Sequence, residues 1–295
     1  MQTRVSTIAL IICLLQPPVL SLKAQTLREP RNSTNRSLAH LVVHGTITKI
    51  VSDQIGGWYL GGDFDSVGGV AVHSAVHIKS DLSVDQTWIP NVAGWAIVVS
   101  DSTVFMAGYT RIVAINRMSG QVTNWVPQLR WMAIHTIAVN DSAVFFAGLS
   151  FASGNLFWGF VTAINRKDAN RVYWKNSTSG TVNAIAISVS DTLLYFGGGP
   201  VGSCDLRTGF LSTWNPNISA SLIDDLSVTD STLYIAGLYS SQQLTRINLA
   251  TVNRKTGAAT NWNPNWTYSD GTTPVITLHG HIAYVGGPFT SIDGQ

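Results

Sequence analysis

Charge is scarce in this sequence. Only 12% of its 295 residues are Asp, Glu, Lys or Arg, about half the share that is usual in a soluble globular domain. No run of basic residues occurs, so nothing in the charge pattern points to nucleic acid. Cysteine is scarcer still, with two residues, which excludes a disulfide framework. No segment shows sustained helical spacing of apolar residues, and this absence argues against a helical fold.

The first apolar run is too short to cross a membrane comfortably and is typical of a signal peptide. Arg4 precedes the run Ile8–Leu15, and Ala24 provides a small residue at a cleavage site. We therefore predict that residues 1–24 are a signal peptide and that the protein is secreted or lies at the cell surface. The alternative is an uncleaved membrane anchor.

Cleavage would change the balance of charge and of thiols. It would leave 16 basic and 16 acidic residues, a formally neutral protein. It would also remove Cys13, so that Cys204 would have no partner for an intrachain disulfide. No later apolar stretch is long enough to span a membrane. Residues 25–37 are polar and are predicted to form a disordered leader.

Glycine and tryptophan are abundant instead, with 26 and 10 residues, and both recur at regular places. A segment that starts with an aromatic residue and ends with a small residue and Gly occurs six times, with closing glycines 46, 40, 50, 39 and 50 residues apart. The copies are Tyr59–Gly62, Phe105–Gly108, Phe145–Gly148, Tyr195–Gly198, Tyr234–Gly237 and Tyr284–Gly287. Such a period is typical of repeat architectures.

Two further elements recur in the same phase. A Trp followed by x-Pro closes four of the units, and Trp174 takes this place in a fifth; the four are Trp88, Trp125, Trp214 and Trp262. An Asp followed by Ser or Thr lies seven residues before the closing Gly at Asp101, Asp141, Asp191 and Asp230. We predict that this Asp caps a turn by bonding nearby backbone amides.

The pattern predicts an all-β fold, a β-propeller of four-stranded blades, because four short strands fit each unit. The apolar strand before each Gly would be the covered middle strand, and the Trp would be a wedge between blades. The β-propeller repeats would occupy 38–295, with blades at roughly 45–90, 91–128, 132–176, 181–217, 222–265 and a partial one at 272–295. A β-sandwich predicts no such recurrence.

About five and a half blades are present by this count, so we expect the propeller to be incomplete and the chain to be a fragment. The sixth unit lacks its third and fourth strands, and Leu38–Val43 could supply one closing strand. An open ring leaves unpaired edges.

The segments Tyr59–Gly69, Tyr284–Gly294 and Ala114–Pro127 resemble the bacterial delta-60-type β-propeller repeat, a domain of unknown function. The resemblance covers about residues 41–295. It implies a secreted or surface protein with a propeller fold, and it implies no particular activity. The second, third and fourth units depart from the family's Gly-Gly-x-Phe turn.

A weaker resemblance carries an enzyme hypothesis. Ala114–Gly120 before Trp125, and Val252–Gly257 before Trp262, are similar to the tryptophan-docking repeat of quinoprotein dehydrogenases. The spacing here is about one residue longer, and Asn replaces the family's Asp. No cofactor-binding set can be assigned, and blade packing explains these residues as well.

Metal sites are not supported by the sequence. Asp63 and Asp65 look superficially like a calcium loop, but the terminal Glu and further ligands are missing, so a turn is the better interpretation. His73 and His77, and likewise His279 and His281, lack the third ligand that zinc needs. We assign no metal and no cofactor.

Catalytic residues also stay unidentified. Asp224 and Asp225 would point to opposite faces of a strand, and a glycosidase pair would come from different blades. Sequons occur at Asn32, Asn140, Asn176, Asn217 and Asn265 and matter only in a host that glycosylates them.

The sequence thus favours a secreted, non-catalytic scaffold or binding module whose propeller loops would bind a protein or carbohydrate ligand. The alternative is a propeller enzyme, either a quinoprotein-like oxidoreductase or a carbohydrate-active hydrolase. Three or more carboxylates or histidines that converge in one pocket near the axis would favour the enzyme.

Overall fold

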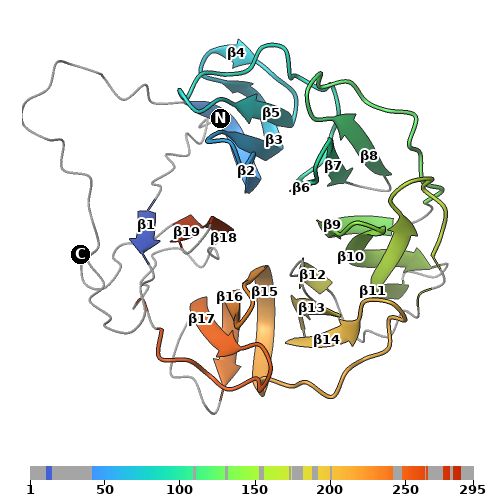
Figure 1. The fold of residues 1–295 in the computed structure, drawn as a ribbon, viewed down its shortest axis with the longest axis vertical. Coiled ribbons are helices and arrows are strands. Elements are labelled where there is room, and N and C mark those ends of the chain that lie inside the picture. Colours follow the sequence, from blue (N-terminus) through green and yellow to red (C-terminus); the bar gives the residue numbers. More distant parts are fainter. Residues whose placement is uncertain are drawn as a thin grey trace, which may run out of the picture.

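The structure is a computed structural model, and it describes residues 11–14, 42–108, 111–129, 132–152, 156–172, 174, 182–187, 192–199, 201–241, 248–262, 264, 275–279 and 282–286. These residues form six small antiparallel sheets of three or four strands, so the prediction of an all-β chain is confirmed. Figure 1 shows the sheets following one another in chain order around a common centre.

Each sheet is built from consecutive strands. The first contains β2 (Val43–Ser52), β3 (Trp58–Val67), β4 (Val70–Ala71) and β5 (Ala75–Ile78), and the second contains β6 (Ala96–Val99), β7 (Thr103–Gly108) and β8 (Arg111–Asn116). The third contains β9 (Met132–Val139), β10 (Ala143–Ala152) and β11 (Leu156–Asn165), and the fourth contains β12 (Val182–Ile187), β13 (Leu193–Gly198) and β14 (Val201–Asp205). The fifth contains β15 (Ile218–Val228), β16 (Thr232–Ser241) and β17 (Asn248–Asn253).

The sixth sheet takes its third strand from the N-terminal part of the chain. It contains β18 (Val275–His279) and β19 (Ile282–Gly286), and β19 pairs antiparallel with β1 (Ile11–Leu14). The sequence had suggested Leu38–Val43 for this position; residues 38–41 lie outside the described ranges, and Val43 begins β2, the innermost strand of the first sheet. Because β1 falls within the predicted signal peptide, cleavage after Ala24 would leave β18 and β19 as the described strands of the sixth sheet.

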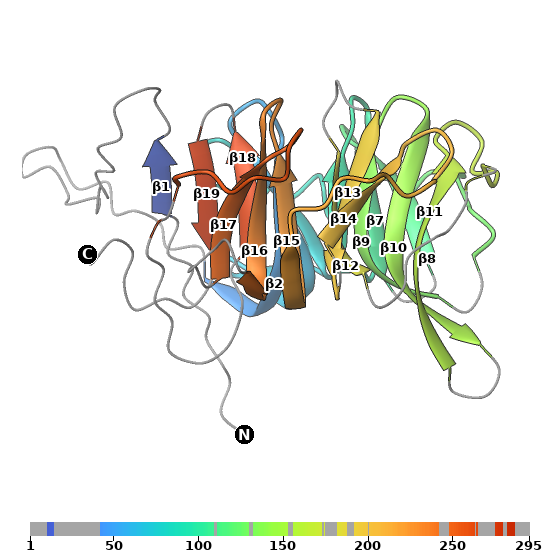
Figure 2. The same ribbon diagram turned by 90° about the horizontal axis from the view of Figure 1, so that it is seen from below.

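The strand nearest the centre of the ring is the first strand along the chain in five sheets and β18 in the sixth, and the middle strand carries the aromatic–small–Gly motif (Figures 1 and 2). The middle strands β7 and β13 are buried at every position except the first, as predicted for strands that are covered on both faces.

The predicted fourth strand is wrong for five of the sheets, where one isolated bridge stands in its place. The bridges are Ile78↔Val84, Ile115↔Val122, Ile164↔Arg171, Cys204↔Leu211 and Val252↔Ala259. Pairing stops there because the next residues turn toward the Trp. In the second sheet, for example, the hydroxyl of Thr123 accepts a hydrogen bond from the backbone N–H of Trp125, and such local bonds compete with a ladder.

The tryptophans lie at the seams between neighbouring sheets. Five apolar clusters each combine residues of two consecutive sheets, and each contains or contacts one Trp of the repeat: Trp88, Trp125, Trp174, Trp214 and Trp262. Every one of these rings lies 4.8–5.9 Å, between centroids, from the aromatic residue of its own middle strand. Tilted and edge-to-face geometry of this kind adds to the free energy gained by burial.

The turn after each third strand is another repeated structure. The first residue of the turn accepts backbone N–H groups two and three residues later with its side-chain oxygen; the four acceptors are Asn116, Asn165, Asp205 and Asn253. The fifth residue of the turn has a positive φ, which favours Gly. It is Gly in three turns and Ala169, with φ 61°, in the third sheet.

The replacement of Ala169 by Gly is expected to stabilise the protein. A left-handed conformation costs a non-Gly residue about 1–2 kcal/mol, and the extra entropy of Gly offsets part of the gain. We expect the free energy of unfolding to rise by up to about 1 kcal/mol, measured by guanidinium denaturation.

The matched control is Gly257→Ala in the equivalent turn of the fifth sheet. There φ is 72°, and a Cβ would lie 2.7 Å from the carbonyl oxygen of Asn215, so this variant is expected to lose stability. A destabilised A169G would contradict the assignment of strain to Ala169.

Candidate functional site

The innermost strands carry β-bulges that direct one residue of each toward the centre of the ring. The register shifts leave Thr48 in β2, His135 in β9, Asn183 in β12 and Asp224 in β15 without an opposite residue. Trp95, directly before β6, has the corresponding place in the second sheet, since its backbone N–H bonds to Ala107. These residues line one cavity of about 70 Å³, and bulges commonly re-aim side chains in this way.

The closing Gly of the repeated motif makes room for the bulge. A Cβ on Gly148 would lie 1.9 Å from the carbonyl oxygen of Ala133, and one on Gly237 would lie 2.3 Å from that of Leu222. Both carbonyls belong to the bulged strand of the same sheet. The small residue before it has a different neighbour, because a Cβ on Gly197 would meet Ile223 of the next sheet at 2.5 Å.

The bulge residues form hydrogen bonds from one sheet to the next. Thr48 donates its hydroxyl to the Trp95 carbonyl at 2.6 Å, and the Trp95 indole donates to the Ile134 carbonyl at 2.8 Å. The Nδ1 atom of His135 lies 2.9 Å from Oδ1 of Asn183. Side chains at the bulges therefore join the first four sheets in sequence.

Asp225 joins the fifth sheet to the sixth and to the first in the remaining part of the ring. One carboxylate oxygen lies 2.5 Å from Nζ of Lys49 in the first sheet, and the other accepts the backbone N–H of Ile276 in the sixth at 2.8 Å. The Asp225 side chain is only 8% exposed. A carboxylate buried to this degree requires such partners.

Loss of Lys49 should therefore weaken the ring measurably. We expect Lys49→Met to lower the free energy of unfolding by about 2 kcal/mol, because it leaves the buried Asp225 carboxylate without its cation. A double-mutant cycle with Asp225→Asn, followed by chemical denaturation, measures the coupling between the two residues.

Lys79→Met is the control for that cycle. Its Nζ lies 3.7 Å from Asp85 at a half-exposed position, where an ion pair contributes at most about 1 kcal/mol. Equal effects of K49M and K79M would show that the axial pair has no special role.

The central cavity is lined by three carboxylate or imidazole groups, those of His135, Asp224 and Asp225, and by the amine of Lys49. The expectation that Asp224 and Asp225 point to opposite faces is wrong, because the bulge at Asp224 interrupts the alternation of the strand and both residues line the cavity. Asp225 is engaged by Lys49 and by Ile276. A volume of about 70 Å³ has room for a few water molecules.

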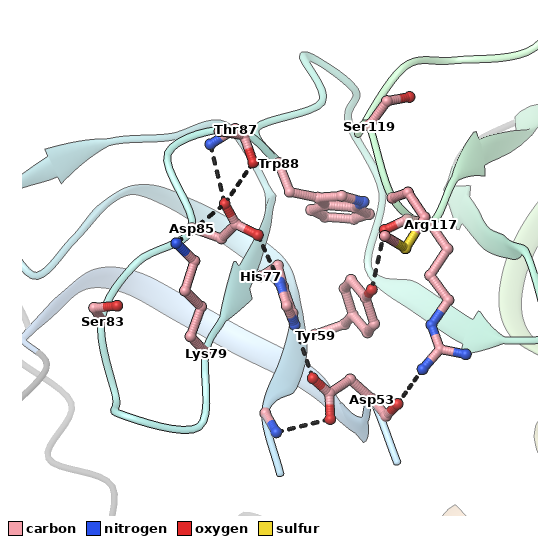
Figure 3. A network of polar contacts seen from close by, with 12 residues as sticks. Asp53, Tyr59, His77, Lys79, Ser83, Asp85, Thr87, Trp88, Arg117 and Ser119 are labelled. Carbon is pink, nitrogen blue, oxygen red and sulfur yellow. Dashed lines mark hydrogen bonds and ion pairs between the residues drawn. The ribbon is translucent and has the colours of Figure 1, made fainter. Parts of the chain in front are cut away.

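A second polar network lies in the first sheet, at its seam with the second (Figure 3). His77 of β5 lies between two carboxylates, with Nε2 3.0 Å from Asp53 and Nδ1 3.0 Å from Asp85. Its ring stacks on Tyr59 at a centroid distance of 4.5 Å. Arg117 of the second sheet donates to the Asp53 carbonyl, so the network crosses the seam.

The electrostatics of this network favour ionised carboxylates. Burial alone would raise the pKa of Asp85, but hydrogen bonds from His77 and Thr87 together with the Lys79 charge lower it to about 2. Burial likewise opposes ionisation of Asp53, and bonds from His77 and from two backbone amides lower its pKa below the usual value. The carboxylate oxygens of Asp53 and Asp85 thus hold the His77 ring against Tyr59 and Trp88.

Acid should weaken this network. Because the folded pKa of Asp85 is about 2 and its ordinary pKa is 3.8, its contribution is complete above about pH 4 and is lost as the pH falls through 2. We expect that loss to be about 1–2 kcal/mol for this partly exposed group. Denaturation of wild type and Asp85→Asn between pH 5 and 2 measures it as a shrinking difference in stability.

Asp63→Asn, at an exposed position of the same sheet, provides the control. Its difference from wild type is expected to stay constant over this pH range. A constant difference for D85N as well would contradict the role assigned to Asp85.

The other sheets place smaller side chains where the first has His77 and Asp85. His77 lies in the third strand and Asp85 in the segment before the Trp. The two residues face each other, because the backbone N–H of Asp85 donates to the His77 carbonyl. The equivalent pairs, identified by the same backbone bond or bridge, are Ala114 with Thr123, Ser203 with Ser212, and Thr251 with Thr260. The serine and threonine pairs bond each other through their hydroxyls.

Arginines link neighbouring sheets at the turns. Arg117 donates to the Asp101 carbonyl of its own sheet and to the Asp53 carbonyl of the preceding one. Arg166 lies 3.3 Å from the Asp101 carboxylate of the preceding sheet and 3.7 Å from that of Asp141. The Asn-Arg pair in these third strands gave no functional signal in the sequence, yet it stabilises the seams.

The predicted turn-capping role of Asp101 and Asp141 is therefore wrong. Both carboxylates are exposed and face Arg166. In the third sheet the preceding residue, Asn140, caps the turn by accepting the N–H groups of Ser142 and Ala143. Asp230 is exposed, and Asp191 lies outside the described residues.

The candidate metal residues have other places. Asp63 and Asp65 lie within strand β3, and the turn that the sequence assigned to them falls at Gly68 and Gly69. His73 is exposed, whereas His77 belongs to the network above.

Of the second histidine pair, His279 is the last residue of β18, and His281 lies outside the described residues. Within the described ranges no three His, Cys, Asp or Glu residues are grouped as metal ligands. Cys204 is buried, and burial raises its pKa to about 12, so the thiol is unreactive near neutral pH.

The larger hollow is a groove of about 640 Å³ between the fourth and fifth sheets, here called the sheet 4–5 groove. It is lined by the start of β13 and the Trp214 segment on one side and by the turn after β17 on the other; the residues are Thr192, Leu193, Tyr195, Ser212, Thr213, Trp214, Asn215, Arg254, Lys255 and Thr256. Sequence reasoning missed this site, because its two walls come from separate repeats of the chain.

Comparison with known proteins supports the fold alone. No family model matches the chain, and no curated protein matches it in sequence. Among solved structures it is similar to the computationally designed Ika8 protein, with a TM-score of 0.51 and 13% identity over 83% of this chain and 81% of that one. The designed Ika4 protein gives a TM-score of 0.39 and 16% identity over 49% of this chain and 87% of that one. No helix in the described ranges is long and apolar enough to span a membrane.

Proposed function

We propose that this chain is a secreted β-propeller of the delta-60 type that acts as a non-catalytic binding module. The first support for a propeller is the arrangement of six small sheets around one centre (Figure 1). The second is that aromatic residues of the repeat fill every seam between consecutive sheets, from the first to the sixth. The resemblance of the repeats to the delta-60 family agrees with this arrangement.

The observation that carries the binding role is the contrast between the two hollows. The central cavity measures about 70 Å³, and Asp225, Lys49, His135 and Thr48 bond across it to neighbouring sheets. The sheet 4–5 groove measures about 640 Å³ and lies between two sheets. Ligand sites usually measure about 300–1,000 Å³, so the groove is the better candidate.

One observation favours a hydrolase as the second candidate. His135, Asp224 and Asp225 meet in the central cavity, which satisfies the criterion of three convergent ionisable groups. Two carboxylates that flank a glycosidic bond need about 5–9 Å between them and space for a sugar. Asp224 and Asp225 are consecutive, and Asp225 is engaged in the ring.

A paired assay of binding and turnover separates these functions. The full chain is immobilised and exposed to an array of oligosaccharides, and in parallel it is incubated with a panel of 4-nitrophenyl glycosides. We expect saturable binding to at least one class of saccharide and no release of 4-nitrophenol above the blank. Asp224→Asn is the matched variant for the second assay.

Two outcomes would overturn the proposal. Glycoside turnover that is abolished in D224N would establish the hydrolase. A new visible absorption band that forms with pyrroloquinoline quinone and calcium, together with dye reduction, would establish the oxidoreductase.

A further inference from the structure

We propose that the sheet 4–5 groove binds an anionic oligosaccharide, a ligand that carries carboxylate or sulfate groups on a chain of hydroxylated rings. This inference rests on the proposed binding function and names its site and ligand class. The groove is formed where the fourth and fifth sheets meet, between the Trp214 segment and the turn that contains Arg254 and Lys255.

The fourth sheet differs from the first at the place that lies beside the groove. The first and fourth sheets share one frame, in which a Tyr hydroxyl donates to the carbonyl of the next sheet's Arg, at 3.3 Å from Tyr59 and at 3.4 Å from Tyr195. In the first sheet the imidazole of His77 and the carboxylate of Asp85 pack beside this frame. Ser203 and Ser212 replace them in the fourth.

The Trp of the fourth sheet lacks a bond that its counterparts in the first and third sheets make. In the first sheet the Trp88 indole N–H donates to the Asn116 carbonyl of the next sheet at 3.2 Å, and in the third the Trp174 indole donates to the Leu206 carbonyl at 3.0 Å. The indole nitrogens of Trp214 and of Trp125 in the second sheet are both buried without a hydrogen-bond partner among the described residues. Trp214 forms the apolar wall of the groove.

The charge of the groove selects an anion. Its two ionisable cations are Arg254 and Lys255, and none of its lining residues is Asp or Glu. Lys255 is exposed and forms no ion pair with any described carboxylate. A charge-assisted hydrogen bond from such a cation to a carboxylate or sulfate is stronger than a neutral one.

The remaining polar groups suit sugar hydroxyls. The hydroxyls of Thr192 and Thr213 lie on one wall at exposed positions. Asn215 uses its Oδ1 to cap the following turn, which leaves its amide N–H₂ to donate. With about 640 Å³ beside an indole ring, the groove has the size and the mixture of one aromatic wall with a few polar groups that ligand sites show.

The third sheet supplies an internal control, because its turn has the same structure and a different charge. Lys167 has the position of Lys255, and both backbone N–H groups bond to the Asn two residues earlier. Asp168 follows Lys167, and the neighbouring Arg166 faces two carboxylates. An anion should therefore prefer Lys255, although both lysines are exposed.

Calorimetric titration of the full chain tests the site. The probes are trigalacturonate, a chondroitin sulfate tetrasaccharide and the neutral maltotriose, with inorganic sulfate as the bare anion. We expect at least one acidic probe to bind about tenfold more tightly than maltotriose, and more weakly as salt is raised. Lys255→Glu should weaken that binding about tenfold or more, whereas Lys167→Glu should change it less than about twofold.

Each contrary result has a distinct meaning. Equal losses in K255E and K167E would show diffuse attraction by the surface and overturn the site. Binding of maltotriose as tight as that of the acidic probes would overturn the anionic ligand class while leaving the binding function in place. Competition by sulfate at the concentration of the saccharide would reduce the site to one for a simple oxyanion, and no binding of any saccharide would contradict the proposed function itself.

Discussion

The close approach of two backbones at the closing Gly of the aromatic–small–Gly motif, seen in the first, third and fifth sheets, is the constraint on which the centre of this structure depends. No side chain fits there, since a Cβ on Gly62, Gly148 or Gly237 would lie about 2 Å from a carbonyl oxygen of the adjacent inner strand. That strand bulges at the same place, and the bulge turns one polar residue toward the centre. The glycine has no side chain of its own to form a bond, but it allows the bulge, and the residue at the bulge forms the hydrogen bonds between sheets.

Aromatic packing at the rim complements these axial bonds. Each Trp closes the seam that its own sheet forms with the next one and lies against the aromatic residue of its middle strand. The cluster on the opposite face of the first sheet draws its described members from that sheet alone, among them Leu60 and Phe64. Asp225, which bonds to Lys49 and to Ile276, therefore carries much of the connection between the two ends of the ring.

The same repeated frame supports two different local structures. Where the frame receives His77 and Asp85, the seam becomes a closed network of ions that excludes solvent from Tyr59 and Trp88 (Figure 3). Where it receives Ser203 and Ser212, the seam leaves a groove with a basic turn on one side. The two pairs differ in volume and in charge, since His77 and Asp85 are replaced by two serines. The second and fifth sheets also carry small residues at these two positions, so the groove depends as well on the turn that faces it from the fifth sheet.

The sequence by itself determined the all-β character, the six units and the covered middle strands. Aromatic, small and glycine residues recur in the same order in each unit, and such a repeat can be recognised without knowing the fold. It could not show which residues meet. Thr48, His135, Asn183 and Asp224 share no motif and lie far apart in the chain, and a bulge that reverses the alternation of Asp224 and Asp225 leaves no local signature. The capping residue of the turn, the third strand of the sixth sheet and the sheet 4–5 groove were likewise decided only by the tertiary structure. Contacts between sheets depend on how the units are placed in space, whereas the repeated residues reflect the local structure within each unit.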